Sequence, residues 1–359
     1  MKRCFFYQFS RVKWYMIRDF FNLVDCKHNF QIASKKDLLG FDIKPSDSLY
    51  FWGKKIDNDI MEWCLSIGVS IFIIEDGLIR SIGLGSALSR PLSLAMDSRG
   101  IYFDPTGPSD LEWLLENHVF DEAELEQAEK LLTMITDLKL SKYNHQLEMP
   151  DIQFCARPGQ TIILVPGQVD DDMSVKFGGF GLTNMRLLEE VRDANPDAYI
   201  VYKPHPDVLS KNRVGDVDDS IPLQWADQVI KKAGIDSVLA QVDEVHTITS
   251  QVGFDGLLRQ KRVYTYGLPF YAGWGLTVDQ RQSERRTRKR TLNELVAASL
   301  LLYPIYMHPE TRKACTAFEA MQWLAEQKDL LSKSLFKRTW LNAKGLILPS
   351  IRNGLKKFR

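Results

Sequence analysis

The sequence has no run of about 18 apolar residues, the length that a membrane-spanning helix needs. Its N-terminal stretch is rich in aromatic residues, but Arg11, Lys13 and Arg18 interrupt it, so a signal-peptide core is missing as well. No spanning helix is therefore expected, and any work at a membrane would take place on its surface.

Cysteine is scarce and shows no pattern. The five cysteines (Cys4, Cys26, Cys64, Cys155 and Cys315) are scattered, odd in number and form no C-x-x-C pair. This spacing predicts neither a disulfide framework nor a thiolate zinc site, and it is typical of a reducing cytoplasm.

Acidic residues are missing from the segment 330–359, which holds eight basic residues. A second basic stretch, 281–290, has six basic residues and one acidic residue. The formal net charge of zero thus hides two segments that suit an anionic partner. No nucleic-acid-binding motif accompanies them, so nucleic acid is not the expected partner.

The remaining composition, with 45% apolar and 26% charged residues, is ordinary for a soluble globular protein, and 359 residues favour two domains. Alternating strand and helix patterns fill the first half. Its predicted strands are 47–53, 69–74, 92–96 and 100–103, and its predicted helices are 57–67, 109–117 and 122–140.

A second alternating region begins near residue 156. Its predicted strands are 161–165, 198–202, 238–240, 245–248 and 262–266, and its predicted helices are 183–195, 251–260, 292–302 and 308–328. We therefore predict an α/β protein with two Rossmann-like domains, residues 1–150 and 151–305, followed by helices and a basic tail at 306–359.

Two neighbouring carboxylates, Glu75 and Asp76, end the apolar run 69–74, and Gly77 follows them. At the end of a strand, one such carboxylate can act as a general base toward a sugar hydroxyl. A turn with two solvated acids is the simpler interpretation, and the pattern alone leaves both open.

Three adjacent acids, Asp170, Asp171 and Asp172, follow the strand 161–165. Like charges this close repel one another, which is usually tolerated when the acids are exposed, bind a metal or have a function. One of them can be a carboxylate nucleophile or stabilise an oxocarbenium-like centre. An exposed acidic loop and a magnesium site are the alternatives.

Lys203 and His205 follow the strand 198–202, and each precedes a proline. The prolines stiffen the backbone and disfavour a helix before them, so both side chains are expected at a strand end, where α/β proteins bind ligands. This arrangement suits an anionic group such as the phosphate of a nucleotide sugar. A structural histidine is the alternative.

Thr249 and Ser250 lead from a strand into the helix 251–260. Hydroxyl groups and free amides at a helix N-terminus form an anion site, although plain N-capping explains the same residues. The segment 266–275 is dense in glycine and aromatic residues. It either stacks on a base or sugar ring or packs as an interdomain loop.

Five motifs occur in a fixed order. They are EDGLIRSIGLG (75–85), PGQVDDD (166–172), YKPHPD (202–207), HTITS (246–250) and YGLPFYAGWGLT (266–277). Each motif is weak singly, but together, over residues 47–305, they resemble the capsular polysaccharide β-Kdo transferases of the KpsC/LipA type. The acid-acid-Gly, His-Pro and Ser/Thr elements also resemble bacterial sialyltransferases, which use CMP-activated keto-sugar acids too.

The resemblance implies a GT-B-like fold, with two Rossmann-like domains facing each other across a cleft. It implies a retaining glycosyltransferase that uses CMP-β-Kdo and a lipid-linked saccharide acceptor, with no cofactor and no metal. The donor-binding residues that it implies are Gln168, Lys203, His205, Pro206, Thr249 and Ser250.

Retention is consistent with a covalent sugar adduct on a carboxylate. The resemblance makes Asp172 or Asp171 the expected nucleophile, and Glu75 or Asp76 the expected acid/base for the acceptor. The best-known enzymes of this type carry two such modules in tandem, whereas this sequence holds one. A single module is not expected to build an alternating oligomer by itself.

The basic tail interleaves aromatic and aliphatic residues with lysines and arginines, and such a segment can bind anionic membrane headgroups. A peripheral position on the cytoplasmic face of the inner membrane is therefore expected, with a merely soluble tail as the alternative. Two other functions stay open. One is a transferase for another CMP-activated nonulosonate such as sialic acid, and the other is a non-catalytic module for capsule assembly.

Overall fold

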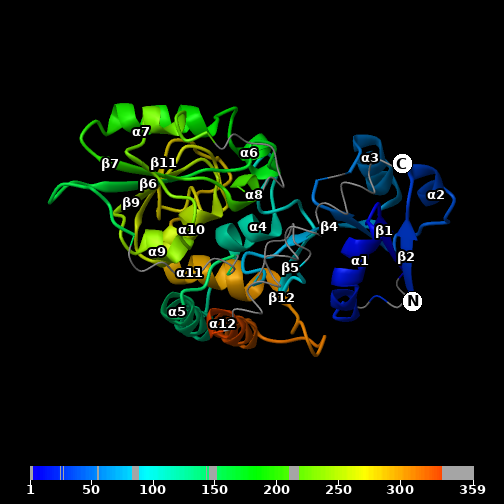
Figure 1. Ribbon diagram of the computed structural model, residues 1–359. Helices are drawn as coiled ribbons and strands as arrows, with labels where there is room; N and C mark the ends of the chain where they lie inside the picture. The colour runs from blue at the N-terminus through cyan, green and yellow to red at the C-terminus, as the bar shows by residue number, and fades with distance from the viewer. Residues whose placement is uncertain are drawn as a thin grey trace.

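The computed structural model of this protein describes residues 3–24, 26, 28–54, 56–82, 89–142, 144, 152–209 and 218–333. The described chain forms two six-stranded β-sheets with helices on their faces (Figure 1). Their strand orders are β12-β5-β4-β3-β1-β2 and β11-β10-β9-β6-β7-β8. The predicted α/β class with two sheets is confirmed.

The first sheet is parallel from β2 to β4 and antiparallel at β5 and β12. Its strands are β1 (Arg3–Tyr7), β2 (His28–Ile32), β3 (Ser48–Trp52), β4 (Ser70–Asp76), β5 (Ser93–Asp97) and β12 (Pro304–Tyr306). The helices of this region are α1 (Arg11–Ile17), η1 (Arg18–Asn22), α2 (Lys35–Leu39), α3 (Asn58–Ile67), α4 (Asp110–Asn117) and α5 (Glu122–Asp137). β12 straddles the predicted boundary at residue 305 and returns to the first sheet.

The second sheet is parallel throughout. Its strands are β6 (Ile162–Pro166), β7 (Tyr199–Lys203), β8 (Gln228–Val229), β9 (Glu244–Thr247), β10 (Arg262–Thr265) and β11 (Val278–Asp279). The helices are α6 (Met173–Gly178), α7 (Asn184–Ala194), α8 (Pro206–Leu209), η3 (Pro222–Gln224), α9 (Ile235–Leu239), α10 (Gln251–Leu258), α11 (Leu292–Val296), η4 (Ala297–Leu302) and α12 (Ala317–Lys333). Within the described ranges, no helix has the length and apolarity to cross a bilayer.

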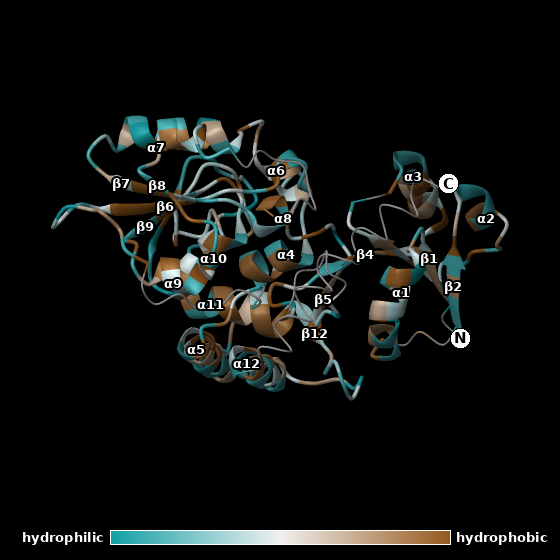
Figure 2. Cartoon of the chain, in the orientation of Figure 1, coloured by the Kyte–Doolittle hydropathy of each residue, from teal (hydrophilic) through white to brown (hydrophobic). Residues whose placement is uncertain are grey.

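Local sequence explains the elements around the second sheet. β6 (IILVP) is a nearly continuous apolar run and is buried along almost its whole length, as a central parallel strand requires. α7 begins where the Thr183 side chain accepts a hydrogen bond from Arg186 N, and it buries one apolar stripe. Figure 2 shows the same contrast, with β6 hydrophobic and α7 of mixed character.

The aromatic N-terminal stretch forms a central strand and its core. Phe5 and Phe6 of β1 are fully buried on opposite faces of the sheet. The Phe6 ring stacks on Tyr50 with centroids 4.9 Å apart, and Phe5 stacks on Phe30 at 5.0 Å. The sequence pattern predicts no element before residue 47, because consecutive aromatic residues buried on both faces show no alternation.

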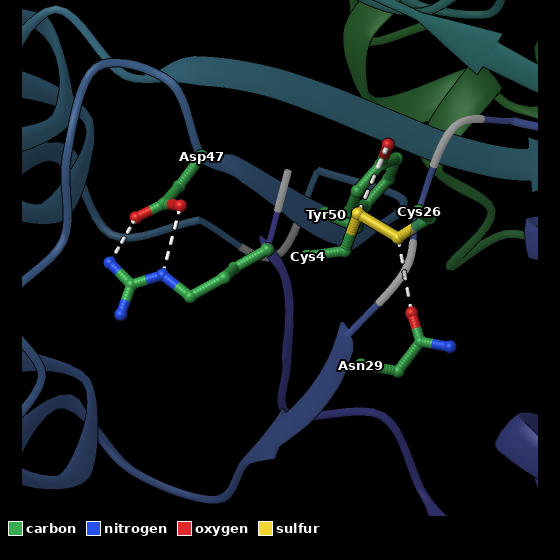
Figure 3. The surroundings of a disulfide bond; sticks show 6 residues. Cys4, Cys26, Asn29, Asp47 and Tyr50 are labelled. Carbon is green, nitrogen blue, oxygen red and sulfur yellow. Dashed lines mark hydrogen bonds and ion pairs between the residues drawn. A yellow bond between two sulfur atoms is a disulfide. The ribbon is translucent and has the colours of Figure 1, made fainter. Parts of the chain in front are cut away.

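Cys4 in β1 and Cys26 after η1 form a disulfide, with their Cα atoms 5.9 Å apart (Figure 3). The expectation of no disulfide is wrong for this pair, because two cysteines far apart in the chain give no spacing signal. Figure 3 shows Tyr50 and Asn29 beside the sulfur atoms. The Tyr50 hydroxyl lies 4.0 Å from Cys4 Sγ, and Asn29 Oδ1 lies 3.1 Å from Cys26 Sγ.

Two predicted strands are wrong. Residues 238–240 belong to the end of α9 and its C-cap, and residues 100–103 form a turn. Short apolar runs of this kind do not distinguish a strand from a buried helical turn.

The two sheets share a hydrophobic core. One continuous cluster includes Ile73 and Ala95 of the first sheet together with Leu164 and Val245 of the second. Helices α5, α11 and α12 pack together beside this core (Figure 1). The two halves of the molecule are therefore held in contact by buried apolar surface as well as by loops.

Candidate active site

The predicted site residues gather at the carboxyl ends of strands. Glu75 and Asp76 end β4, Gln168 follows β6, His205 follows β7 and Thr249 follows β9. Because β7, β6 and β9 are parallel neighbours, the last three residues lie along one edge of the second sheet.

Glu75 and Asp76 form a half-buried acid pair. The Asp76 carboxylate pairs with the Arg80 guanidinium, with Oδ2 and Nε 2.7 Å apart, and Arg80 is only 2% exposed. The backbone N–H of Asp76 donates to Glu75 Oε1 at 2.9 Å. The Tyr102 hydroxyl donates to Asp76 O at 3.1 Å. The pair is thus fixed by its own backbone and by one buried arginine.

The pKa values of the two carboxyls are shifted in opposite directions. Burial and the neighbouring charge of Asp76 raise the pKa of Glu75 to about 7. Burial also acts to raise the pKa of Asp76, but the Arg80 guanidinium and the more distant Lys13 hold that pKa below its ordinary value. One carboxyl can therefore carry a proton near neutral pH while the other stays ionised, which is the arrangement that acid/base chemistry uses.

Glycine at position 77 is required by close packing. A Cβ built on Gly77 would lie 2.0 Å from Ser93 Oγ, so any side chain would push β5 away from the acid pair. The requirement for glycine at this position is therefore steric. Gly83 and Gly85, later in the motif 75–85, lie outside the described residues.

Two cations near the acid pair were missed as site residues. Lys13 of α1 places its Nζ 3.4 Å from the centre of the Trp52 ring, and its charge acts on both Glu75 and Asp76. Arg80 had a sequence signal, since it stands four residues after Asp76. Lys13 had none, because only the tertiary structure brings α1 to the end of β4.

The acids at 170–172 have a different environment. Asp170 and Asp171 are exposed, and Asp170 accepts a hydrogen bond from Asn184 Nδ2 at 3.0 Å. Asp172 is the N-cap of α6, because its Oδ1 accepts hydrogen bonds from the N–H and the hydroxyl of Ser174, at 2.8 and 2.7 Å. Exposure relieves the repulsion among the three charges, as the sequence alternative of an exposed acidic loop anticipated.

Gln168 and Thr249 join two strand-end loops through reciprocal hydrogen bonds. Thr249 N donates to Gln168 Oε1 at 2.9 Å, and Gln168 Nε2 donates to Thr249 Oγ1 at 3.0 Å. Thr249 also contacts Ser174 of α6, with the two hydroxyl oxygens 3.3 Å apart. The loops after β6 and β9 are therefore one unit, and it includes the helix that Asp172 caps.

Lys203 and His205, at the end of β7 and just after it, differ in burial and in hydrogen bonding. Lys203 is buried, its Nζ donates to Ala233 O at 2.7 Å, and burial lowers the pKa of its ammonium to about 8. His205 is half-buried, and its Nδ1 accepts a hydrogen bond from Asp207 N at 3.1 Å. In the neutral ring this places the proton on Nε2. Pro206 opens α8, a position that proline favours.

Ser250 caps α10. Its side chain accepts a hydrogen bond from Val252 N at 3.2 Å, and its carbonyl accepts from the Tyr271 hydroxyl at 2.5 Å. The capping interpretation of this residue is therefore correct. Two neighbouring amides are also bonded within the protein, Ser250 N to Thr247 Oγ1 at 3.1 Å and Gly253 N to Ser250 O at 3.0 Å.

The aromatic loop 266–275 is packed. Tyr271 and Trp274 are fully buried, and Trp274 Nε1 donates to Phe270 O at 2.9 Å. Of the two interpretations left open by the sequence, the structure supports the packed interdomain loop.

Part of the basic stretch 281–290 is also structural. Arg285 and Arg286 both pair with the buried Glu112 of α4, at 2.6 and 2.9 Å. Arg286 further donates to Pro269 O at 2.6 Å and Ala272 O at 2.8 Å. These arginines tie the aromatic loop to the first half of the molecule.

The two halves of the candidate site touch at two places. Gln251, the first residue of α10, donates its side-chain N–H to Leu78 O, just beyond the acid pair. Lys54, after β3, places its Nζ 4.6 Å from the centre of the Phe177 ring in α6. The acid pair, the α6 cap and the start of α10 therefore belong to one contiguous region of the molecule.

The opposite edge of the second sheet carries an open depression of about 900 Å³, lined by residues such as Gln160, Thr161 and Asp243. It lies at the amino ends of β6 and β9, away from His205 and Thr249. Ligands of open α/β sheets bind at the carboxyl edge, so position and chemistry favour the edge with the acids. In the described part of the chain, no three His, Cys, Asp or Glu side chains form a group able to hold a metal ion.

The protein is an α/β protein with two largely parallel sheets. Acids, a histidine and a capped helix start lie at the carboxyl ends of the strands, which is where open α/β sheets bind ligands. The chain belongs to the family described as capsule polysaccharide biosynthesis protein, whose profile matches residues 51–307. This match confirms the family to which the five motifs point.

Curated relatives agree. The capsule polysaccharide modification protein LipA of Neisseria meningitidis serogroup B is 43% identical over 315 residues, which cover 87% of this chain and 44% of LipA. The lipopolysaccharide-processing protein LpsZ of Rhizobium meliloti is 38% identical over 291 residues, covering 79% of this chain and 65% of LpsZ. The chain thus spans less than half the length of LipA and just under two thirds of LpsZ.

Two solved structures are similar over almost their whole length. Thermosulfurimonas dismutans KpsC, β-Kdo 2,7 transferase, matches with a TM-score of 0.75 and 36% identity, covering 91% of this chain and 99% of that one. The β-Kdo 2,4 transferase of the same KpsC matches with a TM-score of 0.76 and 33% identity, covering 89% and 97%.

Proposed function

We propose that this protein is a retaining glycosyltransferase that transfers Kdo from CMP-β-Kdo to a lipid-linked saccharide in the biosynthesis of a capsule or a related surface polysaccharide. The observation that carries the proposal is the half-buried Glu75–Asp76 pair, with its oppositely shifted pKa values, two residues before the contact of Leu78 with α10. Its support from relatives is the likeness to two β-Kdo transferases at 36% and 33% identity.

The two sheets act as the halves of a GT-B-like fold in this proposal. The second sheet binds the donor and the first sheet presents the acceptor. The contacts of Gln251 with Leu78 and of Lys54 with Phe177 support this arrangement, because they hold the two strand edges next to each other.

The residues that bind the sugar donor lie at the carboxyl ends of β6, β7 and β9. The positive end of the α10 dipole and the ring of His205 bind the phosphate of CMP. Gln168 and Thr249 hold the loops in place through their reciprocal hydrogen bonds. Lys203 contributes positive charge from below the surface, since its Nζ is buried against Ala233 O. Pro206 fixes the backbone after His205.

The first chemical step forms a sugar ester on an aspartate. The carboxylate oxygen attacks the anomeric carbon of Kdo, the bond from that carbon to the phosphate oxygen breaks, and CMP leaves with the electron pair. Asp172 suits this role better than Asp171. Both Ser174 contacts go to its Oδ1, and among the described residues nothing donates a hydrogen bond to Oδ2.

The second step transfers the sugar to the acceptor. Glu75, as the ionised base, removes the proton from the acceptor hydroxyl, whose oxygen attacks the anomeric carbon and releases the aspartate carboxylate. Two inversions at one carbon give net retention. Asp76, held ionised by Arg80, keeps the proton affinity of Glu75 high enough to accept this proton.

The acceptor is lipid-linked and the protein works peripherally at the cytoplasmic face of the inner membrane, with the basic tail on anionic headgroups. Most of that tail, residues 334–359, lies outside the described residues. One module supplies one type of linkage in this proposal, in line with the two KpsC structures, of which one is a β-Kdo 2,7 transferase and the other a β-Kdo 2,4 transferase.

The test is an incubation of the purified protein with CMP-Kdo or CMP-sialic acid and a synthetic Kdo-ended acceptor, read by mass spectrometry. A mass gain of one Kdo, with the β-linkage established by NMR, is the expected result. Turnover with CMP-sialic acid alone would mean that the donor sugar is a nonulosonate such as sialic acid and not Kdo. No turnover with either donor, while the acceptor still binds, would favour a non-catalytic assembly module.

A further inference from the structure

Three arginines from distant parts of the chain meet at the end of α1. Arg18 follows α1, Arg90 precedes β5, and Arg312 lies between β12 and α12. Their guanidinium groups approach the Asp19 carboxylate at 3.9, 3.8 and 3.5 Å. Three positive charges against one negative charge leave this cluster with a net charge of +2.

An exposed tyrosine completes the cluster. The Tyr15 side chain is 52% exposed, and the guanidinium carbons of Arg18 and Arg90 lie 5.2 and 5.0 Å from its ring centre. Hydrogen bonding from Arg312 and the charge of Arg90 lower the pKa of its hydroxyl. We call these five residues (Tyr15, Arg18, Asp19, Arg90 and Arg312) the arginine patch.

The arginine patch differs from the structural arginines of the same protein. Arg285 and Arg286 each reach Glu112 within 2.9 Å and also donate to backbone carbonyls. Among the described residues, no guanidinium group of the patch donates to a backbone carbonyl, and the three side chains stay 25–45% exposed. The patch therefore holds positive charge and hydrogen-bond donors in excess of what its own residues use.

The patch is joined to the acid pair by short stretches of chain. Leu92 N donates to Arg80 O at 2.8 Å, and Arg80 pairs with Asp76. Arg90 stands two residues before Leu92, which is at most about 7 Å along an extended chain. Tyr15 shares α1 with Lys13, whose charge acts on Glu75. A short oligosaccharide bound at the acid pair can therefore extend over the patch.

We propose that the arginine patch binds carboxylates of the acceptor saccharide, namely those of acidic sugars already joined to it. This inference rests on the proposed function, in which the acceptor is a lipid-linked saccharide that can end in Kdo, an acidic sugar. A guanidinium fork matches the two oxygens of a carboxylate, and an exposed aromatic ring packs on the apolar face of a sugar. The patch sets which acceptors are held, and it takes no part in bond making.

The experiment uses the full chain with Arg90 and Arg312 both replaced by alanine. The probe is a synthetic oligosaccharide with two Kdo residues, and its binding is measured by calorimetry without donor. We expect about tenfold weaker binding and a smaller dependence on salt, because two exposed ion pairs are lost. The acceptor KM should rise by the same factor, with kcat and the donor KM unchanged.

Arg99→Ala is the matched control. Arg99 is as exposed as Arg18 and also lies over an aromatic ring, Trp113 at 5.2 Å, but it is paired with Asp110 at 3.0 Å. This variant should bind the probe as the wild type does. The dimethyl ester of the probe, which has no carboxylate charge, should bind the wild type and the Arg90→Ala/Arg312→Ala variant equally.

Unchanged probe binding in the double variant, with an unchanged thermal unfolding temperature, overturns the inference. Vesicles of phosphatidylglycerol test the competing partner. If the double variant loses vesicle binding and keeps probe binding, the patch serves a lipid surface and the inference is wrong. If no donor supports transfer while probe binding still depends on Arg90 and Arg312, the proposed function fails and the carboxylate site stands.

Discussion

Two acidic clusters occupy equivalent places at the carboxyl ends of β4 and β6, but their surroundings differ. Glu75 and Asp76 are half-buried next to the buried Arg80, and their pKa values move in opposite directions. In the second cluster Asp170 is exposed, and Asp172 caps α6 through Ser174. Similar residues at similar strand ends therefore have different environments.

The difference follows from what covers each cluster. Burial next to one cation separates the protonation states of two carboxyls, which suits a group that must take up a proton. A capping carboxylate is held by one oxygen in a fixed orientation, which suits a nucleophile. The predictions below test this division of roles, starting with the largest effect.

Asp172→Asn should remove the nucleophile and keep the fold. Asparagine caps a helix as well as aspartate does, so the unfolding temperature should stay close to that of the wild type. An amide cannot form the sugar ester, so transfer measured by mass spectrometry should fall about 10³-fold or more.

Asp170→Asn is the control within the same cluster, and we expect transfer within about twofold of the wild type, as for other surface substitutions. If Asp172→Asn transfers normally and Asp171→Asn does not, the nucleophile is Asp171. Full transfer by both variants contradicts the covalent route through this cluster.

Glu75→Gln should remove the base. We expect kcat to fall by about 10²- to 10³-fold. In the wild type, transfer should rise with pH through about 7, because the base must lose the proton that its raised pKa retains. The residual activity of the variant should lack this rise. Glu126→Gln, at an exposed position of α5, should keep both the rate and the pH profile. A rise through pH 7 that survives in Glu75→Gln would show that another group carries the proton.

Arg80→Gln should reduce the difference between the pKa values of Glu75 and Asp76. Without the guanidinium, the pKa of Asp76 rises, and the pair of acids holds its proton to higher pH. The rise in transfer should therefore move to higher pH. Loss of one partner of a buried ion pair should also lower the unfolding free energy by about 2 kcal/mol, measured by urea denaturation.

Arg186→Gln is the control for the loss of a paired arginine at the surface, where Glu189 is its partner and no change in stability is expected. An unshifted pH profile in Arg80→Gln would mean that Asp76 does not set the proton affinity of Glu75.

Thr249→Val should give the smallest effect. The substitution removes the hydroxyl that Gln168 Nε2 and Ser174 contact, so the strand-end loops lose one link. The unfolding free energy should fall by about 1 kcal/mol, and the donor KM should rise about fivefold with a smaller change in kcat. Thr136→Val, whose hydroxyl donates only to carbonyls of its own helix, is the matched control. An equal donor KM in both variants would remove Thr249 from the donor site.

Much of the site could be predicted because it follows from local patterns. Apolar runs ending in Glu75 or Lys203 indicated strands, and the polar residues after them indicated the ligand edge. Lys13 and the arginine patch could not be found this way, because their members come from separate segments. The prediction for the loop 266–275 stayed open for the same reason, since burial of Trp274 depends on Arg286 and the neighbouring core.

The sequence by itself determined the order of strands and helices and the polar residues that end each strand, because both depend on near neighbours along the chain. Only the tertiary structure decided which acids are buried and which cations stand beside them. Desolvation and charge proximity arise between distant segments, as Lys13, Asp76 and Arg80 show. This is why two acidic motifs of similar appearance differ in their chemistry.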